Sequence, residues 1–282
     1  MNTSALRLRA PVTELDHVHV YLSESELPAC DQKELRFWAE DPRYNRASGL
    51  WENLKVKAGE LRIFEELLPL LSPAPGLRML ELGAGQGWAS LMLKRNHPAC
   101  EVHASDVSPE AMLGAEKWER LFETRLDGYW ACQADRTPFA DEQFDRVFTF
   151  AAFHHFAIGD RARAALAECL RVLKPGGRLL LLLEPCAPAW LHGWSKRRLD
   201  RIRERAGVDI EEDVLVPGHL RRWAKELGAK MEVRFDTRWA WREVRLPGVL
   251  RDAAVERVPA LGWLMPMGAH FLLEKVGGAV SA

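Results

Sequence analysis

The sequence predicts an α/β fold built on a doubly wound, mostly parallel sheet of seven strands. Between residues 57 and 184, short apolar segments alternate with segments whose apolar residues recur at helical spacing. The run Arg178 to Leu183 is almost entirely leucine, which is typical of a central parallel strand buried on both faces. A glycine-rich run, Gly83 to Gly87, lies between an apolar strand and a helix-forming stretch. Together these features indicate parallel strands joined by right-handed helical crossovers.

The boundaries of the elements follow from apolar spacing and from helix-breaking residues. A helix is expected from Lys57 to Leu71, and the prolines and glycine of residues 73–76 end it. The predicted strands are Leu77 to Leu82, Glu101 to Ser105, Tyr129 to Ala134, Phe144 to Ala151, Arg178 to Leu183, Lys230 to Asp236 and Gly268 to Lys275. The further predicted helices are Pro109 to Phe122, Asp160 to Leu173, Trp190 to Arg205 and His219 to Leu227.

Composition narrows the class of protein. The chain has 282 residues, of which 48% are hydrophobic and 28% charged, as in an ordinary globular protein. The net charge of -1 gives no reason to expect a nucleic acid as partner. The five cysteines are scattered and never form a Cys-x-x-Cys pair, so we expect free thiols and no metal site. No signal-like core or membrane-spanning stretch occurs, so we expect a cytoplasmic protein, of undetermined oligomeric state.

The glycine-rich loop points to a nucleotide site. Glycine tolerates positive φ and lets a ligand approach the backbone. A loop between a strand and a helix N-terminus is where open α/β sheets bind nucleotides. The spacing here is Gly-x-Gly-x-Gly, whereas dinucleotide loops read Gly-x-Gly-x-x-Gly. The spacing therefore favours a cofactor without a pyrophosphate and disfavours a nicotinamide dehydrogenase.

Four motifs carry a resemblance to a known family. They are Glu81 to Gly87, Asp106 at the end of the second strand, Ala134-Asp135 with Pro138-Phe139 and Phe144-Asp145, and Leu170 to Gly177. In this order they resemble the class I S-adenosylmethionine-dependent methyltransferases, especially the methyltransferase type 11 branch that includes quinone-biosynthesis enzymes. The resemblance covers residues 57–184 strongly and implies a Rossmann-like fold and S-adenosylmethionine as cofactor, with S-adenosylhomocysteine as product.

The resemblance also implies which residues hold the cofactor. They are Glu81, Gly83, Ala84, Gly85, Gly87, Asp106, Val107, Asp135 and Arg136. The glycines would admit the methionine portion, and Asp106 would accept both ribose hydroxyl protons. A helix N-cap before Ser108-Pro109 is the alternative for Asp106. Asp135 would accept from the adenine amino group, with a plain turn aspartate as the alternative. Glu81 would orient the loop or meet the cofactor's amino group.

The candidate catalytic residues are His154 and His155, which follow the fourth predicted strand. Ligands of open α/β sheets lie beyond the carboxyl ends of the strands, and histidine titrates near neutrality. Either histidine could act as a general base or bind the substrate, while one could simply pack or cap the next helix. Glu184, after the fifth predicted strand, is a candidate substrate contact, and Cys186 is expected to be a plain buried thiol.

Two segments lie outside the cofactor motifs. Residues 1–56 are expected to form an extension, either a lid or a packing flap, with Trp38, Tyr44 and Trp51 as candidate substrate contacts. Residues 57–282 would form the methyltransferase domain, with a substrate-wall insertion around residues 185–228. Within it, the basic stretch 190–205 is a solvated helix face, a site for an acidic substrate, or a weak membrane-surface contact.

The sequence therefore predicts a methyltransferase acting on a small molecule, with O-methylation favoured over N- or C-methylation. A sugar, a glycan precursor or a secondary metabolite would fit as acceptor. An RNA methyltransferase is the alternative, disfavoured by the near-neutral charge and by Phe153-His154-His155-Phe156 in place of an Asn/Asp-Pro-Pro-aromatic motif. A non-catalytic protein that only binds S-adenosylmethionine is the second alternative.

Overall fold

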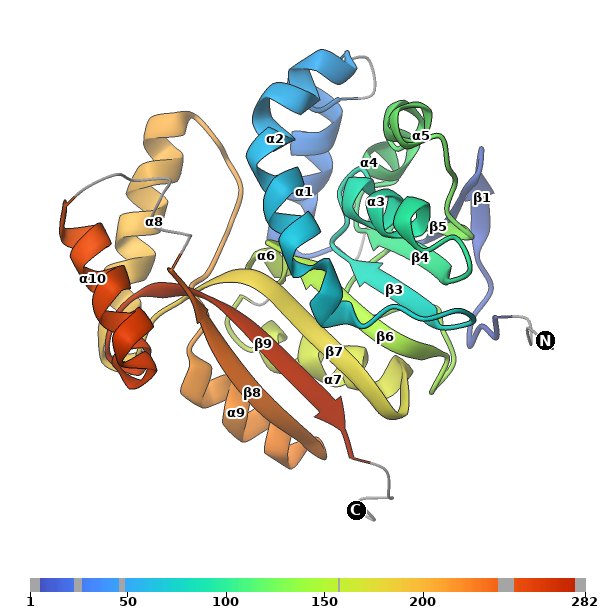
Figure 1. Cartoon of the computed structure of the whole chain (residues 1–282). Coiled ribbons are helices and arrows are strands. Elements are labelled where there is room, and N and C mark those ends of the chain that lie inside the picture. Colours follow the sequence, from blue (N-terminus) through green and yellow to red (C-terminus); the bar gives the residue numbers. More distant parts are fainter. Residues whose placement is uncertain (1–5, 23–26, 46–48, 157, 238–245, 277–282) are drawn as a thin grey trace.

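The computed structural model of the chain describes residues 6–22, 27–45, 49–156, 158–237 and 246–276. These residues form one nine-stranded sheet in the order β1-β2-β5-β4-β3-β6-β7-β9-β8 (Figure 1). The strands are β1 (Thr13–Leu15), β2 (Val18–Tyr21), β3 (Arg78–Leu82), β4 (Glu101–Asp106), β5 (Gly128–Cys132), β6 (Phe144–Phe150), β7 (Leu173–Cys186), β8 (Ala229–Asp236) and β9 (Met267–Lys275). Strands β2 to β7 are parallel, whereas β1, β8 and β9 each run antiparallel to a neighbour.

The α/β class is confirmed, and each of the seven predicted strands is present. The sheet nevertheless has nine strands rather than seven. The additional strands, β1 and β2, come from the N-terminal segment. Strand β2 pairs in parallel with β5, from Val18 beside Tyr129 to Tyr21 beside Cys132. Both strands are very short, and all three residues of β1 are exposed. Strands this short contain too few residues to show the apolar alternation from which a strand is predicted.

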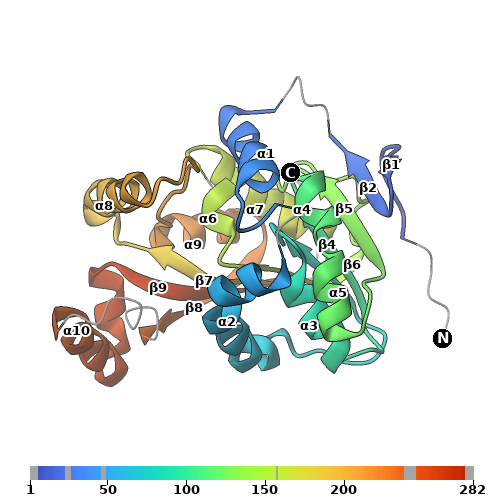
Figure 2. The ribbon, with the colours of Figure 1, turned by 90° about the horizontal axis from the view of Figure 1, so that it is seen from above.

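The helices cover both faces of the sheet, as a doubly wound fold requires (Figures 1 and 2). They are α1 (Ala29–Glu40), α2 (Leu50–Leu67), η2 (Leu68–Leu71), α3 (Trp88–Asn96), α4 (Pro109–Leu113), α5 (Glu116–Phe122), α6 (Phe153–Phe156), α7 (Arg161–Val172), η3 (Ala189–Leu191), α8 (His192–Ala206), α9 (Pro217–Glu226), α10 (Leu246–Arg257) and η5 (Pro259–Leu264). One hydrophobic core lies between one face of the sheet and helices α2, α3 and α5. A second core lies between the opposite face and helices α7 and α9. All five cysteines are free and buried.

Two helices differ from their predicted bounds for local reasons. The predicted helix Pro109 to Phe122 is divided into α4 and α5 at Gly114. A Cβ at Gly114 would lie 2.7 Å from Gln86 Nε2, so glycine admits the Gln86 side chain at this break. The predicted helix from Lys57 begins earlier, at Leu50, because Leu50 and Leu54 continue its apolar face and pack against the same core.

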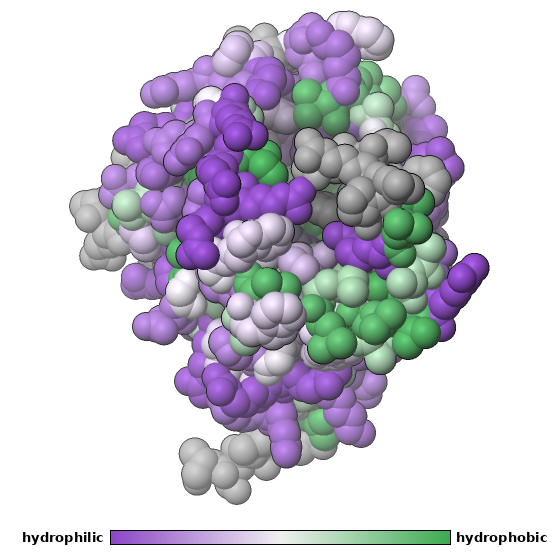
Figure 3. Space-filling view, turned by 90° about the vertical axis from the view of Figure 1, so that its left-hand side faces the viewer, coloured by the Kyte–Doolittle hydropathy of each residue, from purple (hydrophilic) through white to green (hydrophobic). Residues whose placement is uncertain are grey.

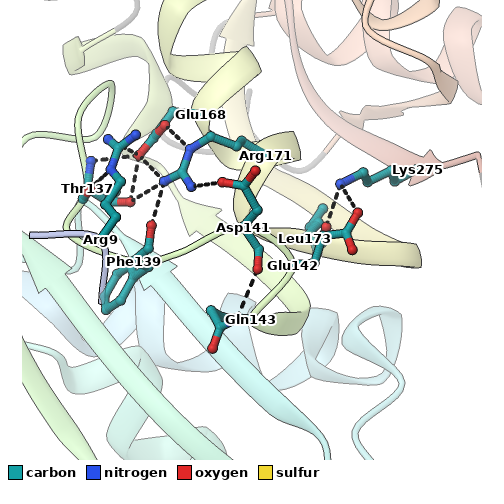
Figure 4. Close-up of polar contacts among 10 residues, drawn as sticks. All are labelled: Arg9, Thr137, Phe139, Asp141, Glu142, Gln143, Glu168, Arg171, Leu173 and Lys275. Atoms are coloured by element: carbon teal, nitrogen blue, oxygen red, sulfur yellow. Dashed lines mark hydrogen bonds and ion pairs between the residues drawn. The ribbon is translucent and has the colours of Figure 1, made fainter. Parts of the chain in front are cut away.

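The N-terminal segment is tied to the main sheet by a buried carboxylate on α7 (Figure 4). Glu168 Oε1 accepts hydrogen bonds from the Thr137 backbone N–H at 2.7 Å and from Arg171 Nη2 at 2.8 Å. It also accepts one from Arg9 Nη2 at 3.2 Å. The segment that precedes α1 is therefore part of the packed structure. Among the described residues, no helix is both long and apolar enough to cross a membrane.

Candidate active site

A cavity of about 430 Å³ lies at the carboxyl ends of the parallel strands. Its volume is in the range of small-ligand sites. The predicted site residues that line it are Trp38, Tyr44, Glu81, Gly83, Ala84, Gly85, Asp106, Val107, His154 and His155. The predicted residues that do not line it are Trp51, Gly87, Asp135, Arg136 and Glu184. The structure therefore gathers residues from β3, β4, α6 and the N-terminal segment around one space.

The glycine loop after β3 forms one side of this cavity. Gly83 and Gly85 have φ values of +69° and +55°, in the left-handed region that favours glycine. A Cβ at Gly83 would lie 2.8 Å from the Ala152 side chain, and one at Gly85 would lie 2.8 Å from the Trp38 ring. Both positions therefore exclude any side chain, and the loop presents bare backbone to the cavity.

Glu81 joins the glycine loop to the first turn of α3. Its Oε2 accepts hydrogen bonds from the Ser90 backbone N–H at 3.0 Å and from Ser90 Oγ at 2.5 Å. The side chain is 2% exposed, and burial raises the pKa of Glu81 to about 8. This geometry agrees with a carboxyl group that holds the loop in place.

Asp106 closes β4 and faces the same loop. Its Oδ2 accepts a hydrogen bond from the Gly85 N–H at 2.8 Å, and its Oδ1 accepts one from the Ser108 N–H at 3.0 Å. Burial raises the pKa of Asp106 to about 6. The N-cap of α4 is Ser108, whose Oγ accepts from the Ala111 N–H at 3.2 Å. Helix capping therefore does not explain Asp106, and a ligand can still bond to its carboxylate oxygens.

His154 lies in α6 and is held by a fully buried carboxylate. His154 Nδ1 lies 2.7 Å from Glu184 Oε2. Glu184 Oε1 also accepts hydrogen bonds from Thr149 Oγ1 at 3.1 Å and from the Phe153 N–H at 2.9 Å. Burial acts to raise the pKa of Glu184, but the bond to His154 outweighs it and holds that pKa below its ordinary value. Glu184 therefore faces His154 and α6 rather than the cavity.

His155 lies between two further carboxylates. Its Nδ1 is 3.0 Å from Glu34 Oε1, and its Nε2 is 3.6 Å from Glu212 Oε1. Burial acts to lower the pKa of His155, but these two glutamates outweigh it and raise the pKa. His154, His155 and Glu212 have ligand atoms within 4.8 Å of one another, as a metal site would require. However, Arg203 contacts both oxygens of Glu212, so a guanidinium already supplies the positive charge there.

The comparisons with known proteins agree with this geometry. A family model described as "Methyltransferase domain" matches residues 80–181, the part of the chain that carries the glycine loop, Asp106 and the histidines. The chain is 39% identical, over 123 residues, to the ubiquinone/menaquinone biosynthesis C-methyltransferase UbiE of Bordetella parapertussis. Residues 80–181 carry a class I S-adenosylmethionine-dependent methyltransferase domain. That match covers 41% of this chain and 46% of the relative, so the chain spans about half the length of such curated relatives.

Two other comparisons extend beyond the part of the chain that carries the glycine loop. The chain is 27% identical over 248 residues to the 27-O-demethylrifamycin SV methyltransferase of Amycolatopsis mediterranei, covering 83% of this chain and 84% of that protein. The geranyl diphosphate C-methyltransferase of Streptomyces coelicolor has a similar fold, with a TM-score of 0.56 and 15% identity over 77% of this chain and 76% of that one. The first match, at 83% of this chain, is much longer than the family match of residues 80–181.

One end of the cavity is organised by Arg161, which sequence reasoning did not single out. Arg161 Nε donates to Asp135 Oδ2 at 2.9 Å, and Arg161 Nη1 donates to Asp31 Oδ1 at 2.8 Å. Gln133 Nε2 also donates to Asp31 Oδ2, at 2.8 Å. Burial acts to lower the pKa of Arg161, but both aspartates outweigh it and raise that pKa. Asp135 is thus engaged by Arg161, and the cavity wall beside it is formed by Cys132, Gln133 and Ala134.

Two further walls of the cavity come from segments outside the family match. Trp38 packs on Gly85 and lies 5.6 Å, between ring centroids, from Tyr44. Trp51, by contrast, is 69% exposed on α2. The segment after residue 202 also lines the cavity, through Arg203, Ala206, Val208, Ile210 and Glu212. The sequence placed Arg203 only within the basic stretch 190–205 and did not single out Glu212, because their pairing depends on the path of the loop after α8.

Proposed function

We propose that this chain transfers a methyl group from S-adenosylmethionine to a hydroxyl oxygen of a small molecule. The observation that carries the proposal is one cavity lined by both the glycine loop with Asp106 and the histidine pair. The groups that would bind the cofactor and the acceptor therefore share one cavity. This proximity is what a direct displacement between two bound molecules requires.

The cofactor half of the cavity fits S-adenosylmethionine. Gly83 and Gly85 present bare backbone where the methionine portion would pass, and Asp106 would accept the ribose hydroxyls. Val107 and the residues of the β5 turn would flank the adenine. When bound, the cofactor supplies a sulfonium-activated methyl group. The protein therefore contributes mainly alignment of acceptor and methyl group, on the order of 7–11 kcal/mol in favourable cases.

The acceptor half of the cavity provides a base for a hydroxyl acceptor. The Glu184 carboxylate contacts Nδ1 of His154, which leaves Nε2 as the nitrogen available to take a proton. General-base assistance of this kind contributes about 10²–10⁴-fold. His155 is placed between Glu34 and Glu212, where it binds and orients polar groups of the acceptor rather than removing a proton.

The wall after α8 supports a bulky acceptor with both polar and apolar parts. Val208 and Ile210 line it beside the charged pair Arg203 and Glu212. The match to the 27-O-demethylrifamycin SV methyltransferase covers 83% of the chain, whereas the match to UbiE covers 41% of it. We therefore place a hydroxylated secondary metabolite first and a sugar or glycan precursor second. Ring C-methylation of a quinol is the competing reaction, and the 39% identity to UbiE favours it.

Calorimetry and a panel of acceptors test this proposal. S-adenosylhomocysteine should bind and NADH should not, because the glycine loop lacks dinucleotide spacing. Phenols, enols, sugars and quinols, each incubated with S-adenosylmethionine, are then examined by mass spectrometry for an added methyl group. Methylation of a hydroxyl supports the proposal. Methylation of a quinol ring carbon supports the competing reaction, and methylation of added RNA would overturn both.

A further inference from the structure

Exposed apolar side chains are concentrated on one region that the active site does not use. Among the described residues, thirteen large hydrophobic side chains are exposed, and seven of them lie between residues 190 and 264. Trp190 in η3 and Trp194 in α8 are 72% and 47% exposed. In α10, Val249 and Leu250 are 53% and 62% exposed. Single exposed apolar residues are ordinary, but such a concentration marks an interaction surface.

Helix α8 adds a basic stripe beside its exposed tryptophan. The helix carries six lysine and arginine residues against two acidic ones, in a chain whose net charge is -1. Trp194, Arg198, Arg201 and Arg205 are all exposed, and their spacing of three or four residues places them on one helix face. The Arg198 guanidinium lies 6.0 Å from the Trp194 ring centroid. The exposed face of α8 is therefore both aromatic and cationic.

The basic and apolar elements lie on the same side of the molecule. Helices α8 and α10 both occupy the left edge of Figure 1 and of the perpendicular view in Figure 2. Figure 3 faces this side and shows a broad hydrophilic area next to a hydrophobic one. We call the surface formed by η3, α8 and α10 the docking face.

We propose that the docking face binds the surface of an anionic lipid bilayer. Tryptophan prefers the membrane–water boundary, arginines are attracted to anionic headgroups, and exposed aliphatic side chains enter the acyl boundary. An acidic protein would complement the arginines but would leave the aliphatic side chains of α10 without a partner. The lipid surface accounts for all three kinds of side chain together.

Docking would also bring the active site near the lipid surface. The same helix that carries the basic stripe contributes Arg203 and Ala206 to the cavity wall. A peripheral contact through α8 would therefore place the acceptor end of the cavity beside the bilayer, where lipophilic molecules accumulate. This inference goes beyond the proposed reaction, and its test does not depend on catalytic activity.

Co-sedimentation of the full chain with lipid vesicles tests the proposal. Vesicles of phosphatidylcholine alone are compared with an equimolar mixture of phosphatidylcholine and phosphatidylglycerol. We expect sedimentation with the anionic vesicles only, weakened by added salt. The variant Arg198→Gln/Arg201→Gln/Arg205→Gln should bind at least about tenfold more weakly, given the attraction of each arginine near the surface. Trp190→Ala/Trp194→Ala should also lose binding.

Matched variants on other surfaces serve as controls. Arg62→Gln/Arg120→Gln/Arg125→Gln removes three exposed arginines elsewhere, and Trp51→Ala removes an exposed tryptophan on α2. Both should bind like the unaltered chain, and circular dichroism verifies that every variant is folded. Absence of binding to the anionic vesicles would overturn the proposal. So would binding that survives in the docking-face variants, or that falls equally in the control variants.

Discussion

Asp106 combines two properties at the scale of a single residue: it holds the glycine loop, and its buried carboxylate has a raised pKa. The Gly85 N–H bonds to one of its oxygens, and the Ser108 N–H bonds to the other. The residue type and position were predictable from sequence, because an acid follows the second strand of the motif. Its protonation behaviour was not predictable, since burial and the neighbouring Glu34 arise only in the folded chain.

Replacement of Asp106 should weaken cofactor binding. Asp106→Ala should reduce the affinity for S-adenosylhomocysteine by at least about 1.5 kcal/mol, roughly tenfold, the lower range for a hydrogen bond to a charged group. Isothermal titration calorimetry measures the change, and Trp51→Ala, on the exposed face of α2, serves as a control that should bind normally. An unchanged affinity in Asp106→Ala would remove Asp106 from the ribose site.

The raised pKa of Asp106 predicts a pH dependence of cofactor binding. The pKa of Asp106 is about 6 in the folded chain, against an ordinary value of 3.8. The folded chain therefore holds this proton more tightly than the unfolded chain does. As pH rises from 3.8 to 6, this group lowers the free energy of unfolding. The ribose hydroxyls need the ionised form, so affinity should fall about tenfold for each pH unit below about 6. The Asp106→Asn variant should lack this dependence. Parallel pH profiles for both proteins would contradict the prediction.

The pair formed by Glu184 and His154 should act as one catalytic unit. Glu184→Gln and His154→Gln should each lower kcat by about 10²-fold or more and leave S-adenosylhomocysteine affinity nearly unchanged. The double variant should be no slower than either single variant, because both changes remove the same base. Steady-state kinetics on the identified acceptor measures this. Full activity in both single variants would exclude the base, and additive losses would exclude the pairing.

The site residues show how far sequence reasoning extends. Gly83, Gly85 and Asp106 lie at motif positions and line the cavity, and so do His154 and His155, which follow the fourth predicted strand. Asp135 and Glu184 also follow strands, yet they point toward Arg161 and His154 instead. A strand end specifies only which edge of the sheet a residue reaches. The partner that orients its side chain comes from a distant segment, which one sequence does not place.

At the scale of elements, the N-terminal segment differs most from its prediction. Its aromatic residues suggested a lid, and α1 does form one wall of the cavity, but β1 and β2 also extend the sheet. These strands contain too few residues to show alternation, and their pairing depends on contact with β5, far away in sequence. The long apolar strands around the glycine loop were predictable because burial on both faces leaves an almost uninterrupted apolar run.

The lid proposal for α1 predicts a contrast between two tryptophans. Trp38 packs on Gly85 inside the cavity, whereas Trp51 is 69% exposed. Trp38→Ala should weaken S-adenosylhomocysteine binding severalfold and lower methyl transfer, because the cavity loses the ring that covers its glycine loop. Trp51→Ala should change neither. Calorimetry and product formation check both variants, and equal behaviour of the two would argue against a lid at Trp38.

At the scale of the whole molecule, Glu168 joins the N-terminal segment, the β5–β6 connection and α7. Burial acts to raise its pKa, but hydrogen bonds from Arg171 and Thr137 outweigh burial and lower it. The lowered folded-state pKa means that this stabilisation is present above the ordinary value of 4.5 and is lost as pH falls below it. The contacts in Figure 4 therefore predict acid-sensitive folding.

Glu168→Gln should reduce the free energy of unfolding by about 2–4 kcal/mol at neutral pH, somewhat below the range for a fully buried pair because Arg171 is partly exposed. Asp141→Asn, which removes an exposed partner of the same arginine, should cost less than about 1 kcal/mol. Urea unfolding followed by circular dichroism gives both values. The difference between the unaltered chain and Glu168→Gln should shrink below about pH 4.5, and a difference independent of pH would contradict the assignment.

The most direct test of the account is transfer of a labelled methyl group. The protein is incubated with methyl-labelled S-adenosylmethionine and a fractionated cell extract, with His154→Gln and Asp106→Ala in parallel. The account predicts label in a small-molecule fraction with the unaltered protein and a strong reduction with both variants. Label in RNA or protein would contradict the proposed acceptor. Absence of label from every fraction, with S-adenosylhomocysteine binding shown separately, would contradict the proposed reaction.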